Sequence, residues 1–403
     1  EPSKRIILSR ILITGMGIIS AIGNSVEENR ESLKNESGGI SQLELYPTAY
    51  AGKLPCGEIK IPTETLSRKL LTNPDPGITR TGLLVLHAAE EAVKDSGLRP
   101  DQLASTDTAL VGATTVGGMC LTDEIFRDAH EKESGTPYTS SYDYASVTLA
   151  AQKRFGILGE ISTINTACSS SANAILFGAR LIKHGFAKRA IVGGADSLAK
   201  FTINGFNALN ILSKNLCAPF DRDRDGLNLG EGAAFLVLER EEDVKGKKVY
   251  AEFAGFGNSN DAFHPSSISA NGEGPFLSMQ EALQRAGLKA ADIGYINAHG
   301  TGTENNDETE SMAMQRLFGS PPPFASTKSF TGHTLGAAGA VEAVYSVLNL
   351  MHQEIYPTLQ FREPIPATNF IPVTHYRKQA LQHVMSNSFG FGGNCTTLIF
   401  SKA

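Results

Sequence analysis

Cys168 lies in the segment NTACSSSANAI (165–175), where serines and alanines follow it. An apolar strand pattern ends before this segment and a helical pattern follows it, which predicts Cys168 at a helix N-terminus. Free N–H groups and the positive end of the helix dipole favour a thiolate there, and small neighbours would let a substrate come close. The segment therefore predicts a nucleophilic cysteine; a small buried structural cysteine is the alternative.

His299 and His333 occupy similar contexts. His299 follows an apolar strand pattern in INAHGTGT, and His333 stands five residues after Lys328 in STKSFTGHTLGAAGAVEA, before a helix of small residues. Ligands in open α/β sheets bind beyond the carboxyl ends of strands, where both histidines and Cys168 are expected. The prediction is one pocket that holds a thiol and two imidazoles; the alternative is two structural histidines.

The segment NSFGFGGNC (387–395) is rich in glycine and asparagine, which gives its backbone freedom after Phe389. We expect a mobile loop whose backbone N–H groups could form half of an oxyanion hole. An ordinary turn before the last strand is the alternative.

The segment DRDRDGLNLGEG (221–232) begins like a calcium-binding loop, with aspartates at its first, third and fifth positions. The twelfth position of such a loop needs a bidentate glutamate, but Gly232 stands there and Glu231 comes one place early. We predict an internally bonded or solvated loop and assign no metal.

Composition narrows the function further. The 403 residues carry a formal net charge of −6, which argues against general nucleic-acid binding. No run of 18 apolar residues occurs, so no membrane partner is predicted. The apolar start, KRIILSRILITGMGIISAIG, is interrupted by Arg10 and glycines, which favours a first buried strand and turn over a signal peptide.

Five cysteines, an odd number and far apart, form no CxxC pair. This spacing argues against a disulfide framework or a zinc module and favours a reducing, cytoplasmic compartment.

Short apolar runs alternate with helical patterns along the chain, which predicts an α/β fold with buried sheets covered by helices. Strands are expected at 10–17, 108–114, 160–167, 189–195, 233–239, 250–257, 293–300 and 396–402, and helices at 81–96, 170–184, 276–286 and 337–351.

A weak internal repeat divides the chain. ILITGMGIIS resembles EFAGFGNSND, each a strand running into a G-x-G turn, and STINTACSSSANAI resembles ASTKSFTGHTLGAAGAV. A charged stretch, EREEDVKGKK, separates the two copies, so we predict two similar halves, 5–248 and 249–403, packed as one unit. Neither G-x-G continues into G-x-G-x-x-G, so a dinucleotide site is not predicted.

Together these motifs resemble the β-ketoacyl-(acyl carrier protein) synthases, elongating condensing enzymes of the thiolase superfamily. The resemblance rests on five ordered segments: TACSSS (166–171), PFDRDRDGLNLGEGAA (219–234), NAHGTGTENNDETE (297–310), STKSFTGHTLGAAGAVEA (326–343) and NSFGFGG (387–393). It implies a thiolase-like fold whose two halves form a layered α-β-α-β-α core.

The resemblance also implies a chemistry. Cys168 would accept an acyl chain from a carrier-protein thioester, and His299 and His333 would donate hydrogen bonds to the thioester oxygen of malonyl-carrier protein. Loss of CO₂ would give a carbanion that attacks the acyl-cysteine in a Claisen condensation, yielding 3-oxoacyl-acyl carrier protein in fatty-acid biosynthesis. The backbone N–H groups of Cys168 and Phe391 would form the oxyanion hole.

Supporting roles follow from the same resemblance. Lys328 would assist the histidines and pair with Glu310, and Asp307 would organise the histidine loop. Thr301 and Thr303 would bind the phosphopantetheine arm.

Aromatic and aliphatic side chains would contact the substrate: Phe206, Phe389, Phe391 and Val116. Val116 matches a position that gates the acyl tunnel, which favours a medium-to-long acyl chain.

Three segments depart from the family pattern. GILGEIST has Glu160 where a proline is common, and the helix SYDYASVTLAAQKRFG lacks the usual asparagine and methionine. GFGGNC replaces the more usual Gly-Phe-Gly-Gly-Thr-Asn. The first two segments line the family's acyl pocket near its dimer interface.

The implied partners are acyl carrier protein, in acyl and malonyl forms, and a second copy of the chain in a homodimer; no cofactor is implied. Because acyl carrier proteins are acidic, a basic patch should flank the pocket mouth. The candidates are SRK (67–69), Arg80 and Lys214.

Three alternatives stay open. The same chemistry could serve a dedicated polyketide or polyene pathway. A degradative thiolase would use a second cysteine as base, for which Cys395 is available but lacks the surrounding glycine pattern. A silent partner subunit would lack the nucleophile, whereas Cys168 and both histidines are present.

Overall fold

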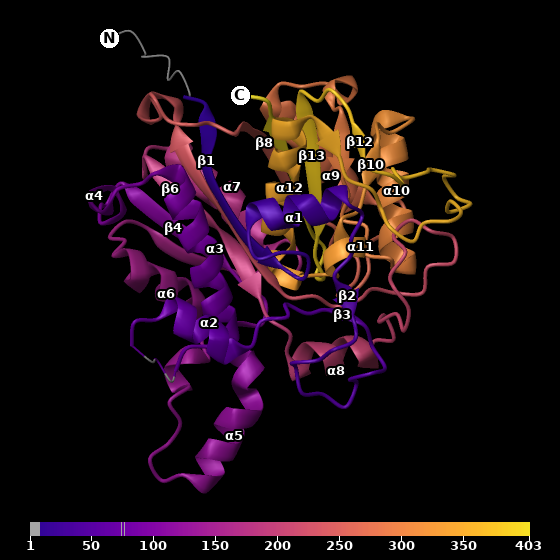
Figure 1. The fold of residues 1–403 in the computed structure, drawn as a ribbon. Helices are drawn as coiled ribbons and strands as arrows, with labels where there is room; N and C mark the ends of the chain where they lie inside the picture. Colours follow the sequence, from indigo (N-terminus) through magenta and orange to yellow (C-terminus); the bar gives the residue numbers. More distant parts are fainter. Residues whose placement is uncertain (1–8, 74, 76) are drawn as a thin grey trace.

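Two sets of five strands, arranged in the same order, form one ten-stranded sheet (Figure 1). When the strands of each half are counted along the chain, both halves have the order third, second, fourth, fifth, first. The second strand of each half runs parallel to the third and fourth, and the fifth runs antiparallel to both neighbours. The two first strands pair at the centre of the sheet.

The computed structural model describes residues 9–73, 75 and 77–403. The strands of the first half are β1 (Ile11–Ser20), β4 (Thr108–Ala113), β5 (Ile161–Ile164), β6 (Arg189–Asp196) and β7 (Gly232–Arg240). Those of the second half are β8 (Ala251–Asn260), β9 (Tyr295–Asn297), β10 (Phe324–Ala325), β13 (His383–Phe389) and β14 (Asn394–Ser401). Two short pairs lie outside this sheet: β2 (Ile40–Ser41) with β3 (Cys56–Gly57), and β11 (Glu354–Ile355) with β12 (Arg377–Lys378).

Helices and half-sheets alternate in five layers. Helices α7 (Ser170–Lys183) and α12 (Ala338–His352) share one apolar core with strands of both half-sheets. Helices α3 (Arg80–Ser96) and α6 (Ala145–Phe155) cover the outer face of the first half, and α9 (Glu273–Ala286) and α10 (Glu304–Phe318) cover the second. The predicted α-β-α-β-α layering is confirmed.

The remaining helices are α1 (Val26–Lys34), α2 (Thr63–Leu70), α4 (Pro100–Leu103), α5 (Thr122–Glu131), α8 (Lys200–Ala208) and α11 (Lys328–Thr331). Of these, α5 projects from the body of the molecule (Figure 1). Within the described ranges, no helix combines the length and the apolar character needed to cross a bilayer.

The G-x-G motifs are not turns, which corrects the sequence prediction. β1 continues through Gly15 and Gly17 to Ser20. The glycines are needed because α3 packs directly on this strand. A Cβ on Gly17 would lie 2.0 Å from the Ala88 carbonyl oxygen, so only glycine fits. Gly257 in β8 stands in the same relation to the Ser278 carbonyl of α9, again at 2.0 Å. The repeated motif therefore marks close contact between helix and strand.

Two elements that position the site were not predicted from the sequence. The residues 387–389, expected in a mobile loop, belong to β13, whose polar Asn387 is fully buried. Helix α10 was not predicted because its buried face carries Asp307 and Glu310 rather than an apolar stripe. Both errors come from buried polar residues that bond within the site.

A buried ion pair fixes the start of α3 against the start of β7. The Arg80 guanidinium contacts both carboxylate oxygens of Glu231, at 2.7 and 3.0 Å, and donates to the Ile59 and Ile61 carbonyls at 3.0 and 2.9 Å. Glu231 also accepts N–H bonds from Ile59 and Leu198. Three segments distant in sequence therefore depend on one guanidinium.

Replacing Arg80 with methionine should lower the free energy of unfolding by about 3–5 kcal/mol, because Glu231 would stay buried without its counter-charge. Urea denaturation measures this change. Arg68→Met, at an exposed position of α2, is the matched control and should shift stability by less than about 0.5 kcal/mol. Equal effects of the two substitutions would contradict this account.

Candidate active site

Cys168 lies in a tight turn between β5, which ends at Ile164, and α7, which begins at Ser170. The turn passes through Ala167 with a φ of 55°, a left-handed conformation that is uncommon outside glycine. The expected position of Cys168 before a helix N-terminus is confirmed. Its side chain is 6% exposed and contributes to the wall of a cavity.

The serines after Cys168 pack helices rather than make room for a substrate, which corrects the first interpretation of this segment. Ser169, Ser170 and Ser171 are fully buried. A Cβ on Gly339 of α12 would lie 2.6 Å from the Ala172 nitrogen of α7, so the two central helices meet almost backbone to backbone. The small residues after both Cys168 and His333 serve this contact.

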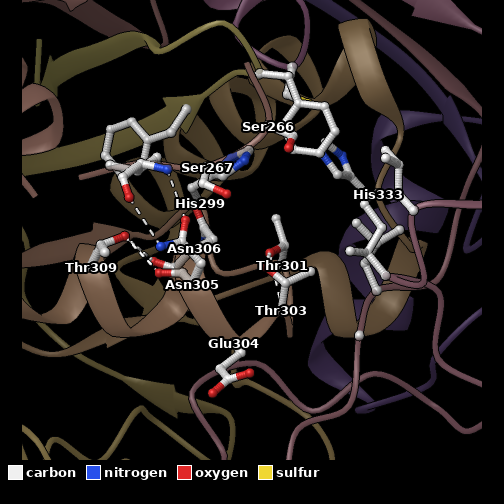
Figure 2. A pocket seen from close by; sticks show the side chains of 18 of the residues that line it. Ser266, Ser267, His299, Thr301, Thr303, Glu304, Asn305, Asn306, Thr309 and His333 are labelled. Carbon is white, nitrogen blue, oxygen red and sulfur yellow. Dashed lines mark hydrogen bonds between the residues drawn. The ribbon is translucent and has the colours of Figure 1, made fainter. Parts of the chain in front are cut away.

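The cavity has a volume of about 620 Å³. Its walls include five of the residues predicted to contact the substrate: Phe206, Thr301, Thr303, Phe389 and Phe391. Figure 2 shows His299 and His333 together with Thr301 and Thr303, whose hydroxyls lie 2.8 Å apart.

Val116 is not among the lining residues. It is buried in an apolar cluster with Leu198 and Leu335, and its N–H donates to Asp196 at 3.1 Å. Its role as a gate therefore remains a prediction.

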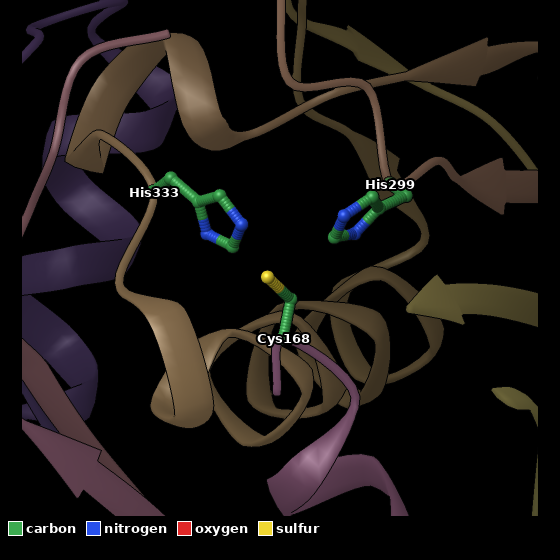
Figure 3. A group of neighbouring side chains, drawn as sticks. All are labelled: Cys168, His299 and His333. Atoms are coloured by element: carbon green, nitrogen blue, oxygen red, sulfur yellow. The ribbon is translucent and has the colours of Figure 1, made fainter. Parts of the chain in front are cut away.

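Cys168 faces both histidines across the cavity floor (Figure 3). Its sulfur and one ring nitrogen from each of His299 and His333 all lie within 4.8 Å of one another. The two imidazole rings meet edge to face, with centroids 5.4 Å apart. The structure thus brings together three side chains from three separate loops.

Both imidazoles are neutral. Burial holds the pKa of His299 well below its usual range, and the positive charge of Lys328 and the neighbouring His333 lower it further. Burial and Lys328 likewise lower the pKa of His333. Neither ring gains a proton near neutral pH.

Hydrogen-bond partners fix the tautomers. The Leu335 N–H donates to Nδ1 of His333 at 3.2 Å, and the Lys328 ammonium lies 3.2 Å from Nδ1 of His299. Because both partners are donors, each Nδ1 is an acceptor and each ring carries its proton on Nε2. The site therefore contains two imidazole N–H donors.

Lys328 pairs with Glu342, not with Glu310 as predicted. Its ammonium forms a buried ion pair with Glu342 and donates to the His299 carbonyl at 2.6 Å. Burial raises the pKa of Glu342 to about 7, although Lys328 acts in the opposite direction. Glu310 lies elsewhere because its carboxylate already accepts three N–H bonds.

Those bonds shape the histidine loop. Glu310 accepts from the His299 and Gly300 N–H groups at 2.9 and 2.8 Å and from the Asn387 amide at 3.0 Å. Asp307 accepts from the Thr301 N–H at 2.8 Å, and also from the backbone of Gly302 and Phe220. The two carboxylates fold the loop so that the imidazole turns into the cavity.

Burial raises the pKa of the Cys168 thiol to about 11, opposite to the expected direction. The charge of Lys328 and hydrogen bonds from the backbone of Phe391 and of Cys168 itself act to lower it. The prediction considered only the helix terminus, whereas desolvation in the closed cavity is the larger effect. The resting group is a thiol whose pKa the backbone of Phe391 and of Cys168 itself acts to lower.

The cysteine and two histidines have the spacing of metal ligands, but their surroundings oppose a metal. Metal-bound histidines donate their second ring N–H to an acceptor. Here the second nitrogens of His299 and His333 face an ammonium and an N–H, which are both donors. We assign no metal to this group.

The calcium-like loop is bonded both within itself and to the segment at 362–363. Asp221 accepts from the N–H groups of Arg362, Glu363 and Asp223 at 2.6, 3.0 and 2.8 Å, so its oxygens are already used.

The proposed basic patch loses one member. Arg80 is only 15% exposed and bonds Glu231, so it cannot meet a partner protein. Arg68 and Lys69 of α2 and Lys214 in the loop after α8 are exposed.

Cys395, the base considered for a thiolase, is buried beside Ile268 and Phe389 in a separate apolar cluster.

The chain matches two family models: Beta-ketoacyl synthase, N-terminal domain, over residues 8–244, and Beta-ketoacyl synthase, C-terminal domain, over residues 250–362. The chain belongs to the β-ketoacyl synthase family.

Named relatives cover nearly the whole synthase. It is 34% identical to 3-oxoacyl-[acyl-carrier-protein] synthase 2 of Vibrio cholerae, over 98% of this chain and 99% of that one, and 36% identical to the protein of that name from Rhizobium meliloti, with the same coverage. Among solved structures, the ishigamide ketosynthase/chain length factor matches with a TM-score of 0.92 and 30% identity, over 98% of this chain and 99% of that one. The ketosynthase ApeO from Xenorhabdus doucetiae, in complex with its chain length factor ApeC, matches with a TM-score of 0.85 and 33% identity, over 99% and 100%.

Sequence reasoning missed three polar residues of this synthase. Glu342 stands on an otherwise apolar helix, which is a signal for a buried partner. Asp196 accepts hydrogen bonds from Thr115 and from the Gly336 N–H at 2.7 Å, which ties β6 to the turn after His333. Asn394 carries no signal in the sequence beyond its departure from the family pattern.

Iodoacetamide should alkylate Cys168 at a rate that rises about tenfold per pH unit between about pH 7 and 10, because a pKa near 11 leaves the thiolate a minor species throughout this window. Peptide mass spectrometry locates the label, and Cys168→Ser is the control. A rate that levels off below about pH 8 would contradict the raised pKa.

Proposed function

We propose that this synthase condenses an acyl group held on Cys168 with malonyl-acyl carrier protein, releasing CO₂ and 3-oxoacyl-acyl carrier protein in fatty-acid biosynthesis. The observation that carries the proposal is the set of one thiol and two Nε2–H donors around a single cavity. The names of the full-length relatives from Vibrio cholerae and Rhizobium meliloti support the same reaction.

The first step is acyl transfer. The Cys168 sulfur attacks the carrier thioester, the carrier sulfur leaves, and the thiol proton ends on that leaving sulfur. Negative charge on the carbonyl oxygen would be stabilised by the N–H groups of Cys168 and Phe391, both of which already act to lower the pKa of the Cys168 thiol. One such donor contributes about 3–4 kcal/mol to the transition state.

The second step is decarboxylative condensation. The malonyl thioester oxygen accepts Nε2–H bonds from His299 and His333 as CO₂ leaves and an enolate forms. The carbanion attacks the acyl carbonyl, the bond to Cys168 breaks, and the released thiolate takes up a proton. Burial and the charge of Lys328 keep the His299 imidazole neutral, and Lys328 also holds its Nδ1, so Nε2–H stays a donor.

The cavity would hold a phosphopantetheine arm. Thr301 and Thr303 line the path toward Cys168 and would bond the amides of the arm, and Phe206, Phe389 and Phe391 would contact its apolar part and the acyl chain. Asp307 and Glu310 serve by positioning the histidine loop. The chemistry needs neither a metal nor a redox cofactor.

A second candidate is the same condensation in a dedicated polyketide or polyene pathway. The structural similarity to ishigamide and ApeO ketosynthases, at 30% and 33% identity, favours it. The acyl chain trapped on Cys168 distinguishes the two pathways.

We further propose a dimer, formed by two copies of this chain. Strand β5 is one of the two outer strands of the sheet and is only half-buried along its length. Leu149 and Leu158 beside it are 47% and 63% exposed. Pairing of two such edges would cover them. A heteromeric pair is the alternative, because the matching ketosynthases of known structure include complexes with a chain length factor.

The two halves, 5–248 and 249–403, are proposed as duplicated units; residues 5–8 lie outside the described part. The repeated strand order supports this division. We also propose a cytoplasmic location, which the five cysteines support because all of them are free thiols.

Intact-protein mass spectrometry with a panel of acyl-carrier thioesters and malonyl-carrier protein tests the reaction. Wild-type protein should gain one acyl mass on Cys168 and lose it when malonyl-carrier protein is added, with release of CO₂. His333→Ala should keep the acyl mass but condense about 10²–10³-fold more slowly, because a donor to the enolate is lost. Retention of the acyl mass by Cys168→Ala, or normal turnover of His333→Ala, would contradict the mechanism.

Reversing the charge of Arg68 and Lys69 should raise KM for the carrier-bound substrate about tenfold and leave kcat unchanged, since exposed charges guide an acidic carrier protein to the pocket. Steady-state kinetics separates the two constants, and Lys402→Glu is an exposed control. An equal loss in kcat would indicate a structural effect instead.

A further inference from the structure

The side chain of Asn394 joins the two turns that carry the proposed oxyanion donors. Its Oδ1 accepts from the Ser169 hydroxyl at 2.7 Å and from the Asn173 amide at 2.8 Å. Ser169 follows Cys168 directly, and Asn173 lies in the first turn of α7. One carbonyl oxygen therefore connects the end of the glycine-rich segment to the residues that hold the nucleophile.

The backbone of Asn394 closes the other turn. Its carbonyl accepts from the Gly390 N–H at 2.8 Å. This bond closes the turn that contains Phe391, so both ends of the turn are held. Gly390 itself packs on the nucleophile turn: a Cβ there would lie 2.6 Å from the Thr166 carbonyl oxygen and 3.2 Å from the Cys168 nitrogen. The position of the Phe391 N–H relative to Cys168 thus depends on how these two turns are held together.

The side chains of Asn258 and Thr396 hold Asn173, the partner of Asn394, in place. Asn258 donates to the Asn173 carbonyl oxygen at 3.0 Å and to the Thr396 hydroxyl at 2.8 Å, and Thr396 donates to the same Asn173 oxygen at 2.9 Å. These bonds fix the orientation of Asn173, so its N–H groups face Asn394 and Thr166. Only an acceptor at position 394 satisfies the donor from Asn173.

We propose that Asn394 is a positioning residue that sets the geometry of the oxyanion hole by locking the Phe391 turn to the Cys168 turn. The proposal rests on the proposed function, since an oxyanion hole has a role only in acyl transfer.

The test compares Asn394→Leu, which keeps the size of the side chain but removes the acceptor, with Asn394→Thr, which keeps an acceptor. Leucine should lower kcat for condensation about 10–100-fold with KM changed less than about twofold, because a donor shifts relative to the transition state while substrate binding is kept. Threonine should retain kcat within about fivefold of wild type. Asn35→Leu, at an exposed position after α1, is the matched control and should match wild type.

Alkylation of Cys168 by iodoacetamide provides a readout that needs no carrier protein. Asn394→Leu should react about 3–10-fold more slowly at a given pH, because loss of the Phe391 N–H bond raises the thiol pKa further. Ser169→Ala removes the other end of the bond and should slow the reaction similarly, with no further loss in the double variant. Circular dichroism and thermal unfolding test whether each variant is folded. If Asn394→Leu does not fold, Ser169→Ala takes its place in the comparison.

Overlapping alkylation profiles for wild type and Asn394→Leu, or equal loss of kcat in the leucine and threonine variants, would overturn the inference. If wild-type protein does not consume malonyl-carrier protein, the proposed function fails, while the alkylation series still decides whether Asn394 positions the Phe391 N–H. The two failures are therefore distinguishable.

Discussion

The buried ammonium of Lys328 is the interaction on which the site depends. It contacts the Glu342 carboxylate, the His299 carbonyl and Nδ1 of the same histidine. A buried ion pair contributes little net stability, since desolvation offsets the attraction, so its effect lies in what it imposes on its neighbours. Burial, aided by this charge, keeps both imidazoles neutral, and the charge opposes the effect of burial on the Cys168 thiol.

The duplicated sheet explains why these groups meet. β5 and β10 hold equivalent positions at the two ends of the sheet, and the turns after them lead into α7 and, through α11, into α12. The two central helices pack so closely at Gly339 and Ala172 that the turns at their N-termini converge on one cavity. Cys168 and His333 are therefore brought together by the same helix contact, and His299 is added by the loop after β9.

Local sequence was enough to predict what each motif could do, because Cys168, His299 and His333 each stand at a boundary between strand and helix patterns. It was not enough to choose between Glu310 and Glu342 as the partner of Lys328, since both lie in matching motifs and only the folded chain shows that backbone N–H groups already occupy Glu310. The predicted direction of the shift in the Cys168 pKa was wrong for a related reason. Desolvation depends on how the cavity closes, and no local pattern encodes that closure.

The groups expected to touch the substrate are uncharged in the resting site. The thiol is protonated, both imidazoles are neutral, and the buried Lys328 ammonium is paired with Glu342. In the proposed reaction, negative charge develops on the acyl oxygen and on the malonyl thioester oxygen. Two backbone N–H groups near the sulfur would stabilise the first, and the two Nε2–H groups across the cavity would stabilise the second. Donors fixed before the reaction need no reorganisation when charge appears, and a dry cavity strengthens each of them. The raised thiol pKa is thus a consequence of the same closed cavity that would stabilise both oxyanions.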